Sequence, residues 1–60
     1  MTTFYHAHVD GFTKQADSIA DVQSWIDGLR SQVAGAELKV WRVVDCVAEV
    51  TPCISGQVTA

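Results

Sequence analysis

Long apolar runs and clusters of basic residues are both missing from this sequence of 60 residues. No stretch approaches the ~18 consecutive apolar residues that a membrane-spanning helix needs, so we expect no membrane segment. The N-terminus lacks a basic segment followed by a hydrophobic one, which predicts a cytoplasmic protein without a secretory signal. The basic residues Lys14, Arg30, Lys39 and Arg42 are scattered. Direct nucleic-acid binding is therefore disfavoured, because it depends on basic side chains that neutralise phosphates.

Proline and cysteine are also scarce, with one proline at Pro52 and two cysteines at Cys46 and Cys53. Hydrophobic residues make up 48% and charged residues 18% of the chain, a composition typical of a folded protein and not of a disordered one. The chain starts at Met1, so we expect one complete small open reading frame and a single domain, residues 1–60. In the cytosol both thiols are expected to stay reduced.

The first segment, "TFYHAHVDG", alternates in the manner of a β-strand and ends at the turn signal Asp10-Gly11. One face carries Tyr5, Ala7 and Val9, and because it is the more apolar face we expect it to point to the core. The other face carries Phe4, His6 and His8. The next residues, "FTKQAD", are interpreted as a connecting loop.

A helix is the clearest element that the sequence predicts. Ser18 followed by Asp21 is similar to a capping box, and Gly35 suits the left-handed position just past the helix end. Asp27 is expected to pair with Arg30 three residues on. The apolar residues recur at spacings of three and four, as on one face of a helix. They are Ile19, Val22, Ile26, Leu29 and Val33, with Trp25 beside them.

The second half of the chain predicts strands. "ELKVWRVVD" is partly apolar on both faces, which indicates a central strand, with Arg42 on one face and Trp41 on the other. "CVAEVTPCI" is interpreted as a third strand in which Pro52 marks an edge position or a bulge. Ser55-Gly56 is interpreted as a turn into a short last strand or a frayed tail. The expected fold class is α+β, β-α-β-β with or without a fourth strand. One amphipathic helix packs on one face of a mostly antiparallel sheet.

A zinc site made of His6, His8, Cys46 and Cys53 has the right residue types but the wrong spacing. Structural zinc sites draw their cysteines from C-x2-4-C pairs, whereas these two are seven residues apart. We therefore expect no metal and no other cofactor, and we interpret both cysteines as small core residues. No catalytic motif surrounds either cysteine or any other residue. A domain of this size also has little room for a substrate pocket, so we expect no enzymatic activity.

The formal net charge is −3, from seven acidic and four basic residues. An acidic surface of this kind can steer association with a basic protein surface. The residues expected to form an acidic patch for a protein partner are Asp10, Asp17, Asp21, Asp45 and Glu49. The second choice for the contact is an aromatic face composed of Phe4, His6, His8 and Trp41. Aromatic residues are enriched at protein interfaces.

In size, acidity and β-α-β-β order, the chain resembles the small phage-encoded anti-CRISPR proteins. Those proteins are compact inhibitors that bind a CRISPR effector. The resemblance covers the whole chain at the level of architecture and assigns no functional residue. It implies a stoichiometric inhibitor, made in the host cytosol, that occludes a basic nucleic-acid-binding surface as a DNA mimic and blocks target-DNA binding.

Two hypotheses therefore compete. The first is the monomeric inhibitor, and the second is a self-associating structural or regulatory subunit, such as a homodimer. The exposure of Trp41, Val43 and Phe4 distinguishes the two hypotheses. If they share an exposed sheet face, self-association is favoured; if the chain folds over them, the inhibitor is favoured.

Overall fold

The turn after the first strand explains how the sheet begins. In the computed structural model, which describes residues 2–59, Asp10 and Gly11 have φ angles of 46° and 85°. Positive φ at both central residues is the signature of a type I′ turn, which joins two antiparallel strands directly. Strand β1 (Thr3–Val9) therefore pairs with β2 (Phe12–Ala16). The sequence-based interpretation of residues 12–17 as a loop was wrong, because the two-residue turn brings the residues after it back along β1.

Helix α1 (Ile19–Val33) follows β2 and matches the predicted helix. The Ser18 hydroxyl oxygen accepts a hydrogen bond of 3.2 Å from the backbone N–H of Asp21, which caps the first turn. Gly35, with φ at 84°, has the left-handed conformation expected just past the helix end. Val22, Ile26 and Val33 are buried. Ile19, Trp25 and Leu29 are partly buried and pack against the same core, so the predicted apolar stripe is confirmed.

Strand β3 (Glu37–Val44) is the centre of the sheet. It pairs antiparallel with β1 on one side, and on its other side with the short strands β4 (Val47–Ala48) and β5 (Ile54–Gln57). The path through the sheet is β2-β1-β3-β4, with β5 beside β3 as well. The expected α+β class and the central position of β3 are confirmed, with β2 as an additional strand before the helix.

The predicted third strand is interrupted in the structure. Only its Val47–Ala48 part forms β4, and Pro52 lies in the loop before β5 and not within a strand. The turn predicted at Ser55-Gly56 was wrong, because both residues pair with β3 inside β5. Pairing with the long strand β3 decides the conformation of this segment. The local Ser-Gly turn signal contains no information about that pairing.

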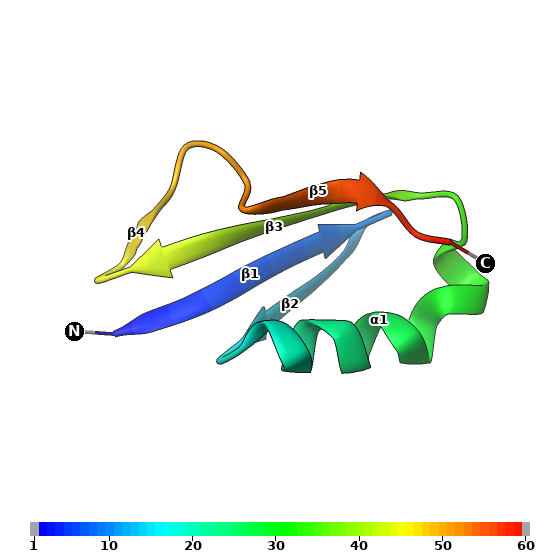
Figure 1. The fold of residues 1–60 in the computed structure, drawn as a ribbon, viewed down its shortest axis with the longest axis horizontal. Helices are drawn as coiled ribbons and strands as arrows, with labels where there is room; N and C mark the ends of the chain where they lie inside the picture. Colours follow the sequence, from blue (N-terminus) through cyan, green and yellow to red (C-terminus); the bar gives the residue numbers. More distant parts are fainter. Residues whose placement is uncertain (1, 60) are drawn as a thin grey trace.

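The core lies between the helix and one face of the sheet (Figure 1). As predicted, Ala7 and Val9 of β1 point to this side and are buried. The buried residues of this core are Ala7, Val9, Ala16, Val22, Ile26, Val33, Val40 and Val58. The molecule therefore has two layers, and α1 covers one face of the sheet.

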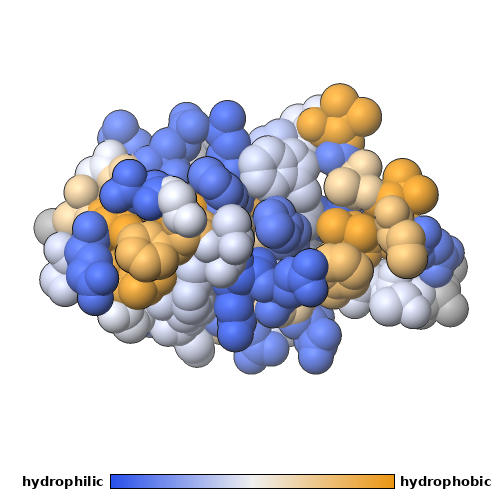
Figure 2. All heavy atoms as spheres, turned by 180° about the vertical axis from the view of Figure 1, so that it is seen from behind, coloured by the Kyte–Doolittle hydropathy of each residue, from blue (hydrophilic) through white to orange (hydrophobic). Residues whose placement is uncertain are grey.

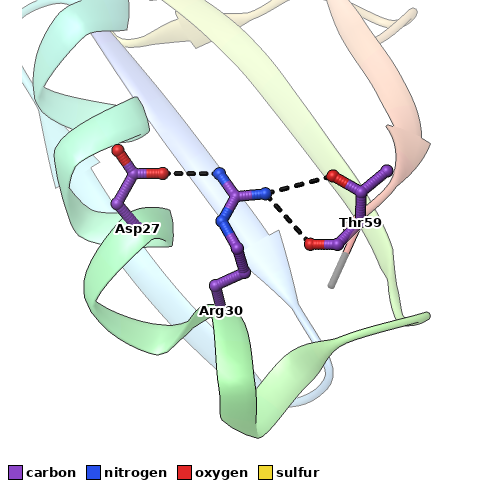
Figure 3. Close-up of polar contacts among 3 residues, drawn as sticks. All are labelled: Asp27, Arg30 and Thr59. Carbon is purple, nitrogen blue, oxygen red and sulfur yellow. Dashed lines mark hydrogen bonds and ion pairs between the residues drawn. The ribbon is translucent and has the colours of Figure 1, made fainter.

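The C-terminal segment after β5 is fastened to the end of the helix. Val58 is buried, and its backbone N–H donates to the Ala36 carbonyl at 2.9 Å. The Arg30 guanidinium lies between Asp27 and Thr59 and donates to Asp27 Oδ1 and to the Thr59 carbonyl and hydroxyl oxygens (Figure 3). The predicted Asp27–Arg30 pair is confirmed. The same arginine also holds the last described residue of the chain against α1.

Candidate contact surfaces

The face of the sheet opposite the helix carries the predicted aromatic residues. The register places Phe4 opposite Val43, and His6 opposite Trp41, on neighbouring strands β1 and β3. Successive strand residues point to opposite faces, so these four side chains lie on the side away from Ala7 and Val40. We call the surface formed by Phe4, His6, His8, Trp41 and Val43 the bare face, since α1 lies on the other side of the sheet (Figure 1).

The side chains of the bare face are partly packed against one another. The His6 and Trp41 rings are 6.4 Å apart between centroids and tilted by 41°. Phe4, His6 and Trp41 are half-buried and His8 is exposed. Val43 is only 8% exposed, although it does not belong to the core under the helix. Strand β1, which carries both histidines, lies inside the sheet and not at its edge, because β2 pairs along its outer side.

The five predicted acidic residues lie in three places. Asp10 is in the turn at one end of β2, and Asp17 follows the other end, so the length of a five-residue strand, on the order of 17 Å, separates them. Asp17 and Asp21 lie together and line a common cavity. Asp45 and Glu49 flank β4 in sequence, far along the chain from both groups.

The carboxylates at the β4 hairpin already have partners within the chain. Asp45 Oδ1 accepts a hydrogen bond of 3.0 Å from the Thr2 N–H. Glu49 forms an ion pair with Arg42, at 3.0 Å between Arg42 Nε and Glu49 Oε1. The hydrogen bond to Glu49, followed by its negative charge, raises the pKa of Arg42 above the ordinary value. These two carboxylates are therefore less available to a partner than Asp17 and Asp21.

The cysteines are placed differently from the sequence-based interpretation. Cys46 lies in the turn between β3 and β4 with φ at 67°, and Cys53 lies just before β5; both are exposed free thiols. The interpretation of both as core residues was wrong, because each lies outside the strands that contribute side chains to the core. Among residues 2–59, no group of three or more His, Cys, Asp or Glu side chains is arranged to hold a metal ion.

Apolar side chains also gather at the end of the molecule where β4 lies (Figure 2). In the view from behind, this end is on the right, on the side of the N-terminus (Figure 2). Val47 in β4 is 69% exposed, and Val50 in the following loop is 97% exposed. Two valines with this exposure extend the apolar surface beyond the area that the helix covers.

Cavities lie on both sides of the helix. The first, of about 460 Å³, lies between the C-terminal half of β2 and the first half of α1. Its lining residues are Lys14, Gln15, Ala16, Asp17, Asp21, Ser24 and Trp25. The second, of about 370 Å³, lies between α1 and the β3–β5 side of the sheet. Its lining residues are Ile19, Val22, Gln23, Ile26, Asp27, Arg30, Leu38 and Ile54.

Sequence reasoning missed the first cavity because it missed β2. A signal was present: Asp10-Gly11 is a strong hairpin turn, and it is followed by Phe12, Lys14 and Ala16 at alternate positions. Applied to both sides of the turn, that signal predicts a second strand with a free outer edge.

Comparison of the chain with protein-family models, with curated proteins and with solved structures finds no match. Over residues 2–59, no helix has the length and apolar character needed to cross a membrane.

Proposed function

We propose that this protein is a binding domain that acts by surface contact and catalyses no reaction, and that its bare face binds a second copy of the chain. The observation that supports this function is the placement of the half-buried side chains of Phe4, His6 and Trp41 side by side, next to the nearly buried Val43, on a sheet face that the helix leaves uncovered. Two sheets can pack face to face through such side chains, about 10 Å apart.

The charge distribution favours a second copy as the occupant. The chain has a net charge of −3, so most of its surface repels another copy. Strand β3 directs one carboxylate to the bare-face side, that of Glu37, and this carboxylate pairs with Lys39 at 3.4 Å. Two copies can therefore meet through this face without bringing unpaired carboxylates together, whereas contact through the first half of the helix would oppose Asp21 of both, which forms no ion pair among the described residues.

Sedimentation velocity over a wide concentration range tests this function. We expect a monomer–dimer equilibrium, and we expect Trp41→Ala to weaken it by a factor of about 30, the loss of ~2 kcal/mol that defines an interface hot spot. The matched control is Val50→Ser, which removes an exposed apolar side chain outside the bare face and should leave the equilibrium unchanged. A protein that stays monomeric at every concentration would contradict the proposal.

A second candidate function is the inhibition of a host defence effector. It is favoured by Asp17 and Asp21, whose carboxylates are exposed, lie together and form no ion pair within residues 2–59. The resemblance to anti-CRISPR proteins implies that the partner is a CRISPR effector subunit and that target-DNA binding is blocked.

A gel-shift assay of target-DNA binding by a CRISPR effector tests the inhibitor. We expect wild-type protein to reduce the shift, and Asp17→Lys combined with Asp21→Lys to restore it, because reversed charges repel a basic surface. Circular dichroism should first show that the double variant is folded. A folded double variant that inhibits as well as wild type would exclude this pair of carboxylates as the contact.

A further inference from the structure

We propose that the outer edge of β2 and the first half of α1 form a groove that binds an extended, basic segment of another protein as an added strand. This surface is separate from the bare face, and the inference extends the proposed binding function to a second partner. The residues that line the groove come from two elements, β2 with Lys14, Gln15 and Ala16, and α1 with Asp21, Ser24 and Trp25; Asp17 joins them.

The edge of β2 offers backbone groups for pairing. Strand β2 is the first strand of the sheet path, so its outer side has no neighbouring strand among the described residues. In a two-residue hairpin the residues next to the turn, Val9 and Phe12, exchange backbone hydrogen bonds, and the pattern alternates along an antiparallel pair. Thr13 and Gln15 therefore direct their N–H and C=O groups outward. A segment that adds to a sheet edge gains its affinity from such groups.

The cavity beside this edge can take side chains of the added strand. Its volume is about 460 Å³, and its floor includes Ala16, which is buried, and Trp25, which is half-buried and packs against the core. Lys14 and Ala16 point to the helix side of the sheet, as their register with Ala7 and Tyr5 requires. An added strand would direct every second side chain to the same side, so an apolar side chain could reach Trp25.

The charges of the groove select a basic segment. Asp17 and Asp21 contribute two exposed carboxylates against the single cation of Lys14. A lysine or arginine two positions from the apolar residue would lie on the same side of the added strand. It would meet the carboxylate end of the groove. The segment that fits therefore has an apolar residue and a basic residue at positions i and i+2.

Lys14 also argues against a second copy at this edge. In the symmetric antiparallel pairing that uses all of β2, Lys14 of one copy lies directly opposite Lys14 of the other. Like charges at opposed positions destabilise a strand pair. A lysine in the middle of an edge strand is a common protection against self-pairing. A basic residue of a foreign segment avoids the repulsion because it sits toward Asp17 and Asp21.

The probe is the synthetic peptide Ser-Val-Thr-Lys-Thr-Val-Ser with blocked ends, which places its valines and lysine on one side of a strand. Titration into ¹⁵N-labelled protein should shift the amide signals of Thr13 to Asp17 and of Trp25, also in a Trp41→Ala background that disables the bare face. The same peptide with glutamate in place of lysine should not bind. Failure of both peptides to shift these signals would overturn the inference, whatever the bare face does.

Three variants test the parts of the groove. Gln15→Pro removes an N–H that points outward and leaves the pairing with β1 intact. An edge strand tolerates proline at such a position, so this variant should fold but should no longer bind the peptide. Asp17→Asn combined with Asp21→Asn should weaken binding about fivefold, because the peptide lysine then loses both of the exposed carboxylates that attract it. Asp27→Asn removes one carboxylate charge from the helix outside the groove and should leave the affinity for the peptide unchanged.

The outcomes that contradict the inference are specific. Full peptide affinity in folded Gln15→Pro would show that the peptide does not pair with the edge of β2. Equal losses in Asp27→Asn and in the groove variants would show a general charge effect and no groove. Concentration-dependent shifts along β2 without peptide would show that a second copy occupies the edge, despite Lys14.

Discussion

Replacing Gly28 by alanine should stabilise the fold. Gly28 lies in the interior of α1, is exposed, and an added Cβ would meet no other atom within 4 Å. The substitution therefore adds no clash and recovers the helix propensity that glycine lacks, about 1 kcal/mol relative to alanine. In a domain of this size that gain raises the melting temperature by roughly 4–8 °C.

Gly35→Ala is the matched comparison, because a Cβ at Gly35 also meets nothing within 4 Å. Here φ is 84°, and a left-handed conformation costs a non-glycine residue about 1–2 kcal/mol. Its backbone N–H also donates to the Val58 carbonyl at 2.8 Å, which holds the conformation in place. The same added methyl group should therefore stabilise at residue 28 and destabilise at residue 35.

Urea denaturation followed by circular dichroism measures both variants, with the slope of the transition expected to stay at the wild-type value. An unchanged or lowered midpoint for Gly28→Ala would refute the reasoning. It would mean that the helix propensity of residue 28 does not limit the stability of this domain.

Further predictions concern the core, a turn, the C-terminal segment and metal binding. Ile26→Ala, at a buried position, should cost about 2–5 kcal/mol and largely unfold the domain in a thermal melt. Cys46→Gly should raise the melting temperature, because φ at 67° strains cysteine and suits glycine. Arg30→Met should increase amide hydrogen exchange at Val58, since the methionine keeps an apolar stem but cannot bind Thr59. Native mass spectrometry of protein purified without chelator should show no bound zinc; a zinc adduct lost with EDTA would contradict this.

The parts of the fold that the sequence predicted are those with a sustained period. The apolar spacing of α1 and the alternation of β1 each extend over enough residues to identify the buried side. Strand β2 was missed because "FTKQA" is short and polar, and its pairing with β1 decides its conformation. The exposure of Cys46 and Cys53 could not be derived either. The apolar character of cysteine predicts burial, whereas both residues are exposed because one lies in a turn and the other in a loop.

The candidate surfaces, too, were predicted where a sequence period extends over many residues and were missed where they depend on tertiary pairing. Alternation alone placed Phe4 and His6 on the face away from the core, and the register places Trp41, which the aromatic face already included, directly opposite His6. Whether Asp10 and Asp17 could belong to one acidic patch depended on the distance between them in the fold. Counting that segment as a loop left Asp10 free to approach Asp17, whereas β2 holds the two at opposite ends of a strand. The cavity at Trp25 depends on how the helix lies against β2, which no local pattern records.

The pairing of β1 with β3 has a consequence for the order of folding. Its register pairs Thr3 with Val44 and Val9 with Leu38, so β2 and the whole of α1 lie between the paired residues along the chain. The β1–β2 hairpin and α1 involve only neighbouring residues, and such elements form within microseconds. Closing a long loop must precede any gain from β1–β3 contacts, so this step limits the folding rate. A mutation in the Asp10-Gly11 turn should therefore act on an early event, while one at Val40 should act on the slow step that completes the sheet.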